Sequence, residues 1–332
     1  MATSSDETIK REIIDFIGSK IGNIEVRVFP DGSNQDQISF EKGGLTFCVD
    51  GVNYGSCDVV YLTVDNDKLN VAILAIEGTD ALNRKSSGNA QYQRFHHALG
   101  AVKNGIIGVY YLKKGREKIR NDLYAMAYHA TLLESGVYLI VQDLNVIKHI
   151  IELYLFDQKN LKTYLKDYSE NSYKIFLNEF NLKYKGSWDL FAEKRSTIVF
   201  KKYIVKHSAR MLRNFTDSSQ RAGHIAVGEM YLSKYFFSPK HLYYLWPRMT
   251  EKDLNYLDVN KSEDKEWYLL RNEPNVTIIT IDNISNVPTN IRKKLKLLSQ
   301  VPLKGIYLKQ YKSCVKYIIE KLKNGEMKLI NV

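Results

Sequence analysis

Two acidic residues at the ends of apolar runs are the strongest candidates for chemistry in this chain. Asp58 opens the run DVVYL, and Glu77 follows the run VAILAI. Two carboxylates that converge are costly unless a cation neutralises them, and hard oxygen ligands suit Mg²⁺, which binds phosphate oxygens as well. Such an ion can activate water and stabilise charge that develops at phosphorus. The alternative is a pair of unrelated acids at strand ends that share no ion.

A β-hairpin must bring these acids together. Strands are expected over 58–64 and 69–77, separated by the turn-rich residues 65–68, DNDK. If the residues that flank this turn pair with one another, Asp58 lies opposite Ala75. Alternation along the strands then puts Asp58, Glu77 and Thr79 on one face, with Glu77 one diagonal step from Asp58. A slip of one residue would separate the acids.

The rest of the apolar pattern predicts an α/β fold with a mixed central sheet flanked by helices. Isoleucines recur at helical spacing over 9–21. Further strands are expected at 24–29, 45–49, 106–112 and 137–141, and further helices at 88–102, 119–134 and 144–155. Buried strands that alternate with helices are typical of a sheet covered on both faces.

The second half of the chain is expected to be mainly helical, with a soft boundary near residue 156. Helices are expected around 161–178, 201–213 and 225–237. A small α/β segment is expected to follow, with strands at 276–281 and 304–308 and helices at 289–298 and 311–323.

Composition points to a polyanionic partner. Lys and Arg number 48 against 37 Asp and Glu, which gives a net charge of +11, and the chain has 23 tyrosines. A cationic surface attracts polyanions such as nucleic acids. The alternative is a lysine-rich composition without any nucleic-acid role.

Several other classes lack their sequence signature. The sequence has no P-loop, no Rossmann glycine fingerprint and no G-x-S-x-G elbow, so neither a nucleotide cofactor nor esterase chemistry is expected. No apolar run approaches the roughly 18 residues of a membrane span, and the N-terminus has no secretory pattern, so we expect no membrane partner and a cytoplasmic location. Cys48, Cys57 and Cys314 fit no metal spacing and are expected to be reduced.

The segment YGSCDVVYL…VAILAIEGT, with a helix and then β-α-β behind it, resembles the PD-(D/E)xK core of type II restriction endonucleases over about residues 5–155. The resemblance implies that Asp58 and Glu77 bind Mg²⁺ as the two acids of the motif. Thr79 stands where the family has a lysine that helps to position the attacking water, and Cys57 replaces the usual proline. Lys85 is the candidate to supply that amine from another position, and its alternative is an ordinary loop lysine.

Three segments are candidates for DNA contact. Asn89 and Arg94, in the run GNAQYQR, faintly resemble the helix start of EcoRI-like enzymes, which contacts bases and the partner subunit. The basic residues that follow the strand expected at 106–112 suit phosphate contact or form a solvated loop. The run 201–224 combines arginines with a glutamine, which suits base recognition; its candidates are Arg210, Arg213, Gln220 and Arg221.

The sequence therefore predicts a Mg²⁺-dependent, site-specific endonuclease of double-stranded DNA, which leaves 5′-phosphate ends as the resemblance implies. Residues 1–156 would form the catalytic core, and 157–332 a basic region for DNA recognition and dimerisation. A homodimer is expected because two-fold symmetry suits a palindromic site. Three alternatives stay open: a catalytically inactive DNA-binding protein on the same fold, a repair or junction nuclease, and a small-molecule α/β enzyme.

Overall fold

The computed structural model describes residues 4–28, 46–64, 70–83, 90–184, 227–228, 230–231, 242–245, 251–259 and 262–279. The chain divides into two compact units, residues 1–179 and 180–332. Six of the expected site residues lie outside the described ranges: Lys85, Asn89, Arg210, Arg213, Gln220 and Arg221.

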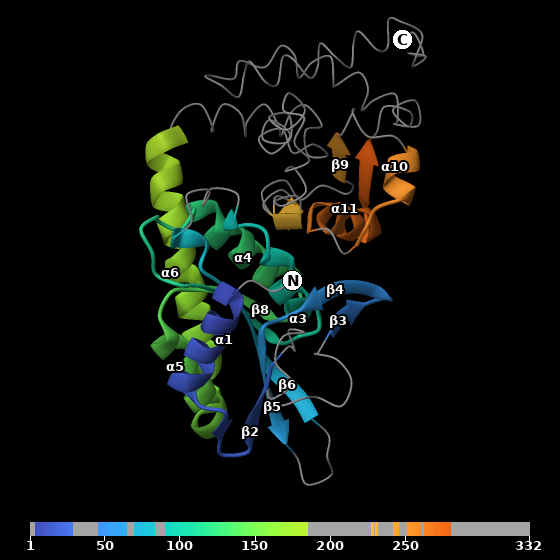
Figure 1. Ribbon diagram of the computed structural model, residues 1–332. Coiled ribbons are helices and arrows are strands. Elements are labelled where there is room, and N and C mark those ends of the chain that lie inside the picture. Colours follow the sequence, from blue (N-terminus) through green and yellow to red (C-terminus); the bar gives the residue numbers. More distant parts are fainter. Residues whose placement is uncertain are drawn as a thin grey trace, which may run out of the picture. The chain divides into compact units, whose positions relative to one another are not determined.

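A mixed six-stranded sheet forms the centre of the N-terminal unit, which confirms the expected α/β fold (Figure 1). Its strands, in spatial order, are β1 (Lys20–Ile21), β2 (Ile24–Val28), β5 (Val59–Val64), β6 (Asn70–Thr79), β7 (Ile107–Leu112) and β8 (Val137–Val141). Neighbours from β1 to β6 are antiparallel, whereas β6, β7 and β8 are parallel. A separate hairpin consists of β3 (Thr46–Val49) and β4 (Val52–Ser56).

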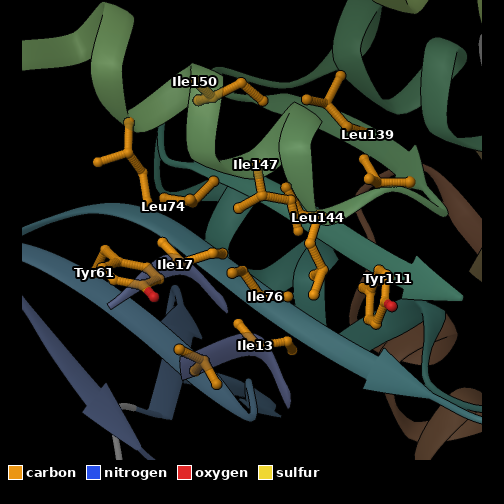
Figure 2. Close-up of a cluster of buried hydrophobic side chains, with 14 of the residues drawn as sticks. Ile13, Ile17, Tyr61, Leu74, Ile76, Tyr111, Leu139, Leu144, Ile147 and Ile150 are labelled. Atoms are coloured by element: carbon orange, nitrogen blue, oxygen red, sulfur yellow. The ribbon is translucent and has the colours of Figure 1, made fainter. Parts of the chain in front are cut away.

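Helices cover both faces of this sheet. One face carries α1 (Ser4–Ile17), α5 (Leu144–Phe156) and α6 (Gln158–Tyr184), whose apolar side chains form one cluster with those of the strands (Figure 2). The described residues of this unit also form α3 (Phe95–Lys103), α4 (Asn121–Leu133) and the short 3-10 helix η1 (Ala81–Asn83). The Phe95 ring of α3 stacks on Tyr138 of β8, with ring centroids 4.5 Å apart, so α3 packs on the opposite face.

The isoleucines of α1 explain why this helix packs where it does. Ile9, Ile13 and Ile17 are at most 5% exposed and share the core cluster with Ile76 of β6. Burying side chains of this size stabilises the fold by roughly 1.5–3 kcal/mol each. Leucines of α6 join the same cluster, at positions 161 and 165, so the N-terminal unit extends past the boundary expected near residue 156.

The β5–β6 hairpin has a different register from the one expected. Pairing at the turn is offset by one residue. A β-bulge at Ile73 of β6, opposite Tyr61 and Leu62, adds a second offset, beyond which Val60 pairs with Ala75. The expected pairing of Asp58 with Ala75 is therefore wrong. Because side chains alternate with period two, an even total offset still leaves Asp58 and Glu77 on a common face.

The described residues of the C-terminal unit include a small parallel sheet. The strand β9 (Leu242–Leu245) pairs with β10 (Val276–Ile279), and the helices are α10 (Glu251–Asn255) and α11 (Ser262–Asn272). The strand expected at 276–281 is confirmed, whereas β9 and α11 were not expected. The helices expected at 201–213, 289–298 and 311–323 and the strand expected at 304–308 lie outside the described residues. None of the described helices combines the length and apolar character needed to cross a membrane.

The first helix approaches β6 very closely at one glycine. A Cβ atom on Gly78 would lie 2.4 Å from Ile9 Cγ2 and 3.5 Å from Ile13 Cδ1. Only a residue without a side chain fits there, because a carbon at 2.4 Å is far inside van der Waals contact. This contact places α1 against the residues that immediately flank Gly78 in β6.

We expect Gly78→Ala to lower the free energy of unfolding by about 1–3 kcal/mol, because the added methyl group overpacks this contact. Urea denaturation would measure the loss. Ile9→Leu removes Cγ2 while conserving volume, so Gly78→Ala should cost less in that background. An equal cost in both backgrounds would show that the contact with Ile9 is not the cause.

Candidate metal site

The two candidate acids are buried side by side where β5 begins and β6 ends. Asp58 is 7% exposed and Glu77 1% exposed, and Thr79, two residues on, is 4% exposed. The apolar run that delivers Glu77 lies between β5 and β7 within the sheet, so its end is shielded from water. An ionised carboxylate in such a place needs partners that offset its lost hydration.

Asp58 is held from two sides. Its Oδ2 accepts a hydrogen bond from the Gly78 backbone N–H at 2.9 Å, and its Oδ1 lies 3.7 Å from Lys10 Nζ. Lys10 is itself only 3% exposed. The close packing of α1 at Gly78 is what brings this ammonium group to Asp58.

Lys10 was not singled out in the sequence, although a signal exists. It occupies the first position of an i, i+3, i+4, i+7 stripe that continues with Ile13, Ile14 and Ile17. A lysine at the start of an apolar helix face is either exposed by fraying or paired with a buried acid. The structure shows that it is paired.

Arg94 lies between the two acids. Its Nη1 donates to Glu77 Oε1 at 3.2 Å and to the Gly78 carbonyl oxygen at 3.5 Å, and it lies 3.9 Å from Asp58 Oδ2. Arg94 was expected to contact DNA, but here its guanidinium group faces the carboxylates, with the side chain 27% exposed. One cationic nitrogen is thus surrounded by two carboxylate oxygens and one main-chain oxygen.

The second oxygen of Glu77 is less well satisfied. Oε2 lies 3.1 Å from His97 Nδ1, but in an orientation that makes no hydrogen bond, and no other hydrogen-bond partner occurs among the described residues. A buried carboxylate oxygen without a hydrogen bond is costly. This oxygen therefore marks a position that a further ligand would stabilise.

Burial favours the neutral forms of Asp58 and Cys57. Burial raises the pKa of Asp58 to about 7, and the negative charge of Glu77 adds to this, while Arg94, Lys10 and the Gly78 N–H act in the opposite direction. Burial, with the charges of Glu77 and Asp58, also raises the pKa of the Cys57 thiol well above its usual value. This shift favours the neutral thiol form of Cys57.

The oxygen atoms at this site fit a hard divalent cation. Mg²⁺ prefers oxygen donors, and Asp58, Glu77 and the Gly78 carbonyl supply three oxygens that already surround the positive nitrogen of Arg94. The buried Glu77 Oε2 without a hydrogen bond is a further donor. The described residues contain no cluster of three or more His, Cys, Asp or Glu side chains arranged to hold a metal ion.

Thr79 stands where the family has a lysine, so this position has no amine. Its carbonyl oxygen accepts a hydrogen bond from the Lys113 backbone N–H at 3.0 Å. Within the described ranges, the amine of Lys10 in α1 lies 3.7 Å from Asp58 Oδ1. The expected alternative, Lys85, lies outside those ranges.

Basic residues follow β7 at the same end of the strands as the two acids. Strand β7 runs parallel to β6 and pairs Leu112 with Thr79, so the segment that follows, 113–120, starts beside the end of β6. We call residues 113–120 the basic connection. Its Lys113 forms an ion pair with Glu12 of α1, whereas its other cationic residues are exposed, namely Lys114, Arg116, Lys118 and Arg120.

No family profile, curated protein or solved structure matches the chain. The fold and the site therefore define the class by themselves: an α/β domain that holds a buried carboxylate pair beside an exposed cationic segment.

The raised pKa of Asp58 predicts how the stability of the fold changes with pH. Because the folded state binds the Asp58 proton more tightly than the unfolded chain, its stabilising effect is complete below about pH 4 and is lost as the pH rises to about 7. Asp58→Asn removes this dependence. Relative to the wild type, we expect its free energy of unfolding to rise by roughly 2 kcal/mol between pH 5 and pH 7.

Urea denaturation in EDTA would measure this difference. The control is Asp15→Asn, which changes an exposed aspartate on α1 and should show no comparable trend. A difference between Asp58→Asn and the wild type that is constant with pH would contradict the assigned environment of Asp58.

Proposed function

We propose that this protein is a Mg²⁺-dependent endonuclease that hydrolyses phosphodiester bonds of double-stranded DNA. The observation that carries the proposal is the convergence of oxygens from Asp58, Glu77 and Gly78 on one cationic nitrogen. This donor set suits Mg²⁺. It lies at the end of the strands where the basic connection begins, so a bound phosphodiester and a bound cation would be neighbours.

Each part of the site has a role in this reaction. When bound, Mg²⁺ would activate a water molecule and polarise the phosphate. Asp58 and Glu77 would hold the ion, while Lys10 and the Gly78 N–H fix the orientation of Asp58. Burial lowers the local dielectric constant, which strengthens every charge interaction with the phosphate.

The finer proposal is a type II restriction endonuclease that cuts at a specific site and leaves 5′-phosphate ends. It rests on the resemblance of the hairpin segment and on the order of elements, in which α1, an antiparallel β2–β5–β6 meander, α3 and the parallel β7 follow one another. Recognition by the basic region, a homodimer on a palindromic site and a cytoplasmic location belong to the same proposal.

A second candidate is a DNA-binding protein that has the same fold but does not cut. It is favoured by Arg94, which already offsets the charge of both acids, and by Thr79, which stands where the nuclease family has a lysine. In that protein the carboxylates and cations would form a structural network, and the basic connection would still bind DNA. A repair or junction nuclease is a third candidate, which differs from the first in its substrate.

The first prediction of this proposal concerns cleavage. We expect purified protein to cut plasmid DNA with Mg²⁺ but not with EDTA, and Asp58→Ala and Glu77→Ala each to lower the rate by more than about a hundredfold because a metal ligand is lost. DNA binding, measured by fluorescence anisotropy, should be largely unchanged. Asp15→Ala, at an exposed position on α1, is the matched control and should cut normally.

The pattern of products separates the candidates. Discrete fragments indicate a site-specific enzyme, a smear indicates a non-specific nuclease, and binding without cutting indicates the non-catalytic protein. Full cleavage by Asp58→Ala or Glu77→Ala would eliminate the proposed site.

The second prediction concerns the basic connection. Lys114→Gln combined with Arg116→Gln should weaken DNA binding and lower the magnitude of the slope of log affinity against log salt by up to about 2. The reason is that each phosphate contact releases counterions from DNA, and the double variant loses up to two such contacts. The control pair is Lys159→Gln with Lys162→Gln, also exposed. These residues follow α5, whose Leu155 lies beside Gly22 at the opposite end of the strands. An equal loss in both double variants would show that only net charge matters.

A further inference from the structure

Arg94 and a divalent cation cannot occupy the carboxylate pair together. The Arg94 Nη1 atom already lies 3.2 to 3.9 Å from one oxygen each of Glu77, Gly78 and Asp58. Mg²⁺ binds oxygen at about 2.0–2.1 Å and requires near-octahedral geometry. An ion that uses these oxygens would lie in close contact with the guanidinium group, and two cations at that distance repel strongly in a buried site.

We propose that Arg94 is an exchangeable counter-ion, which a divalent cation displaces from the oxygens of Asp58, Glu77 and Gly78. This inference rests on the proposed function, because it assumes that the metal binds at these oxygens. It adds a competition that sets the apparent metal affinity of the site.

The two cations of the site differ in their freedom to move. The Lys10 side chain of α1 is 3% exposed, whereas the Arg94 side chain is 27% exposed and has a route to solvent. Arg94 also occupies the N-cap position of α3, where the helix dipole disfavours a positive charge. The acids therefore hold the Arg94 guanidinium in place, and a stronger competitor for them would release it.

Charge balance gives the exchange a consequence for substrate. In the structure, the Lys10 ammonium group and the Arg94 guanidinium group carry two positive charges beside the two carboxylates, and His97 Nδ1 lies 3.1 Å from Glu77 Oε2. If a divalent ion replaces the guanidinium group, the site gains net positive charge and the released guanidinium adds its own beside it. Both changes favour a phosphodiester anion, so metal binding would prepare the site for DNA.

Isothermal titration of the full chain with MgCl₂, without DNA, tests the exchange directly. Arg94→Gln removes the competing cation and should bind Mg²⁺ at least about tenfold more tightly than the wild type. The matched control is Arg116→Gln, which removes the same charge from the basic connection without touching the acids, and its affinity should stay within about twofold of the wild type. Equal or weaker binding by Arg94→Gln would overturn the exchange.

A second measurement covers the case in which Arg94→Gln is unfolded without metal. Circular dichroism during a MgCl₂ titration should then show the fold returning, because the ion takes over the neutralising role of the guanidinium group. Failure to fold at any Mg²⁺ concentration would overturn the exchange.

The titration also separates the two proposals. Mg²⁺ binding of equal strength to the wild type and Arg94→Gln eliminates the exchange alone. Absence of Mg²⁺ binding in both proteins eliminates the proposed metal site and with it the exchange.

Discussion

The burial of two carboxylates at the end of β6 is the constraint on which the rest of the site depends. Glu77 is almost fully shielded and Asp58 nearly so, and an acid removed from water is stable only with charged or hydrogen-bonding partners. Two helices meet this demand from opposite faces of the sheet, α1 with Lys10 and α3 with Arg94. The packing of α1 and α3 on the sheet therefore also positions the cations of the site.

The oxygens around Arg94 and the second oxygen of Glu77 are the observations on which the proposed cation site rests. A structural ion pair needs only one acceptor for each donor. Here one nitrogen of Arg94 gathers oxygens from both side chains and from the main chain, while Glu77 keeps a buried oxygen without a hydrogen bond. A buried oxygen without a hydrogen bond costs free energy, and in our proposal a bound cation offsets that cost.

The hairpin shows both the reach and the limit of sequence reasoning. Strand alternation placed Asp58 and Glu77 on one face, but the inferred pairing was wrong, because the pairing at the turn is offset by one residue and a β-bulge opposite Tyr61 and Leu62 adds a second offset. A bulge depends on how a strand packs and twists, which the apolar pattern does not report. The common face was predicted despite this, since the two offsets that the pattern missed add up to an even number.

The sequence by itself determined the mixed sheet, the helices of the N-terminal unit and the acids at the strand ends, because apolar periodicity and turn residues act locally. Only the tertiary structure decided which cations meet those acids. Lys10 lies far from Asp58 in the chain and reaches it because Gly78 leaves room for α1. Arg94, expected to face DNA, instead faces the carboxylates because the start of α3 packs beside β6. Such long-range pairing follows from packing: the stripe of α1 marks Lys10 as part of an apolar face but does not say which acid it meets.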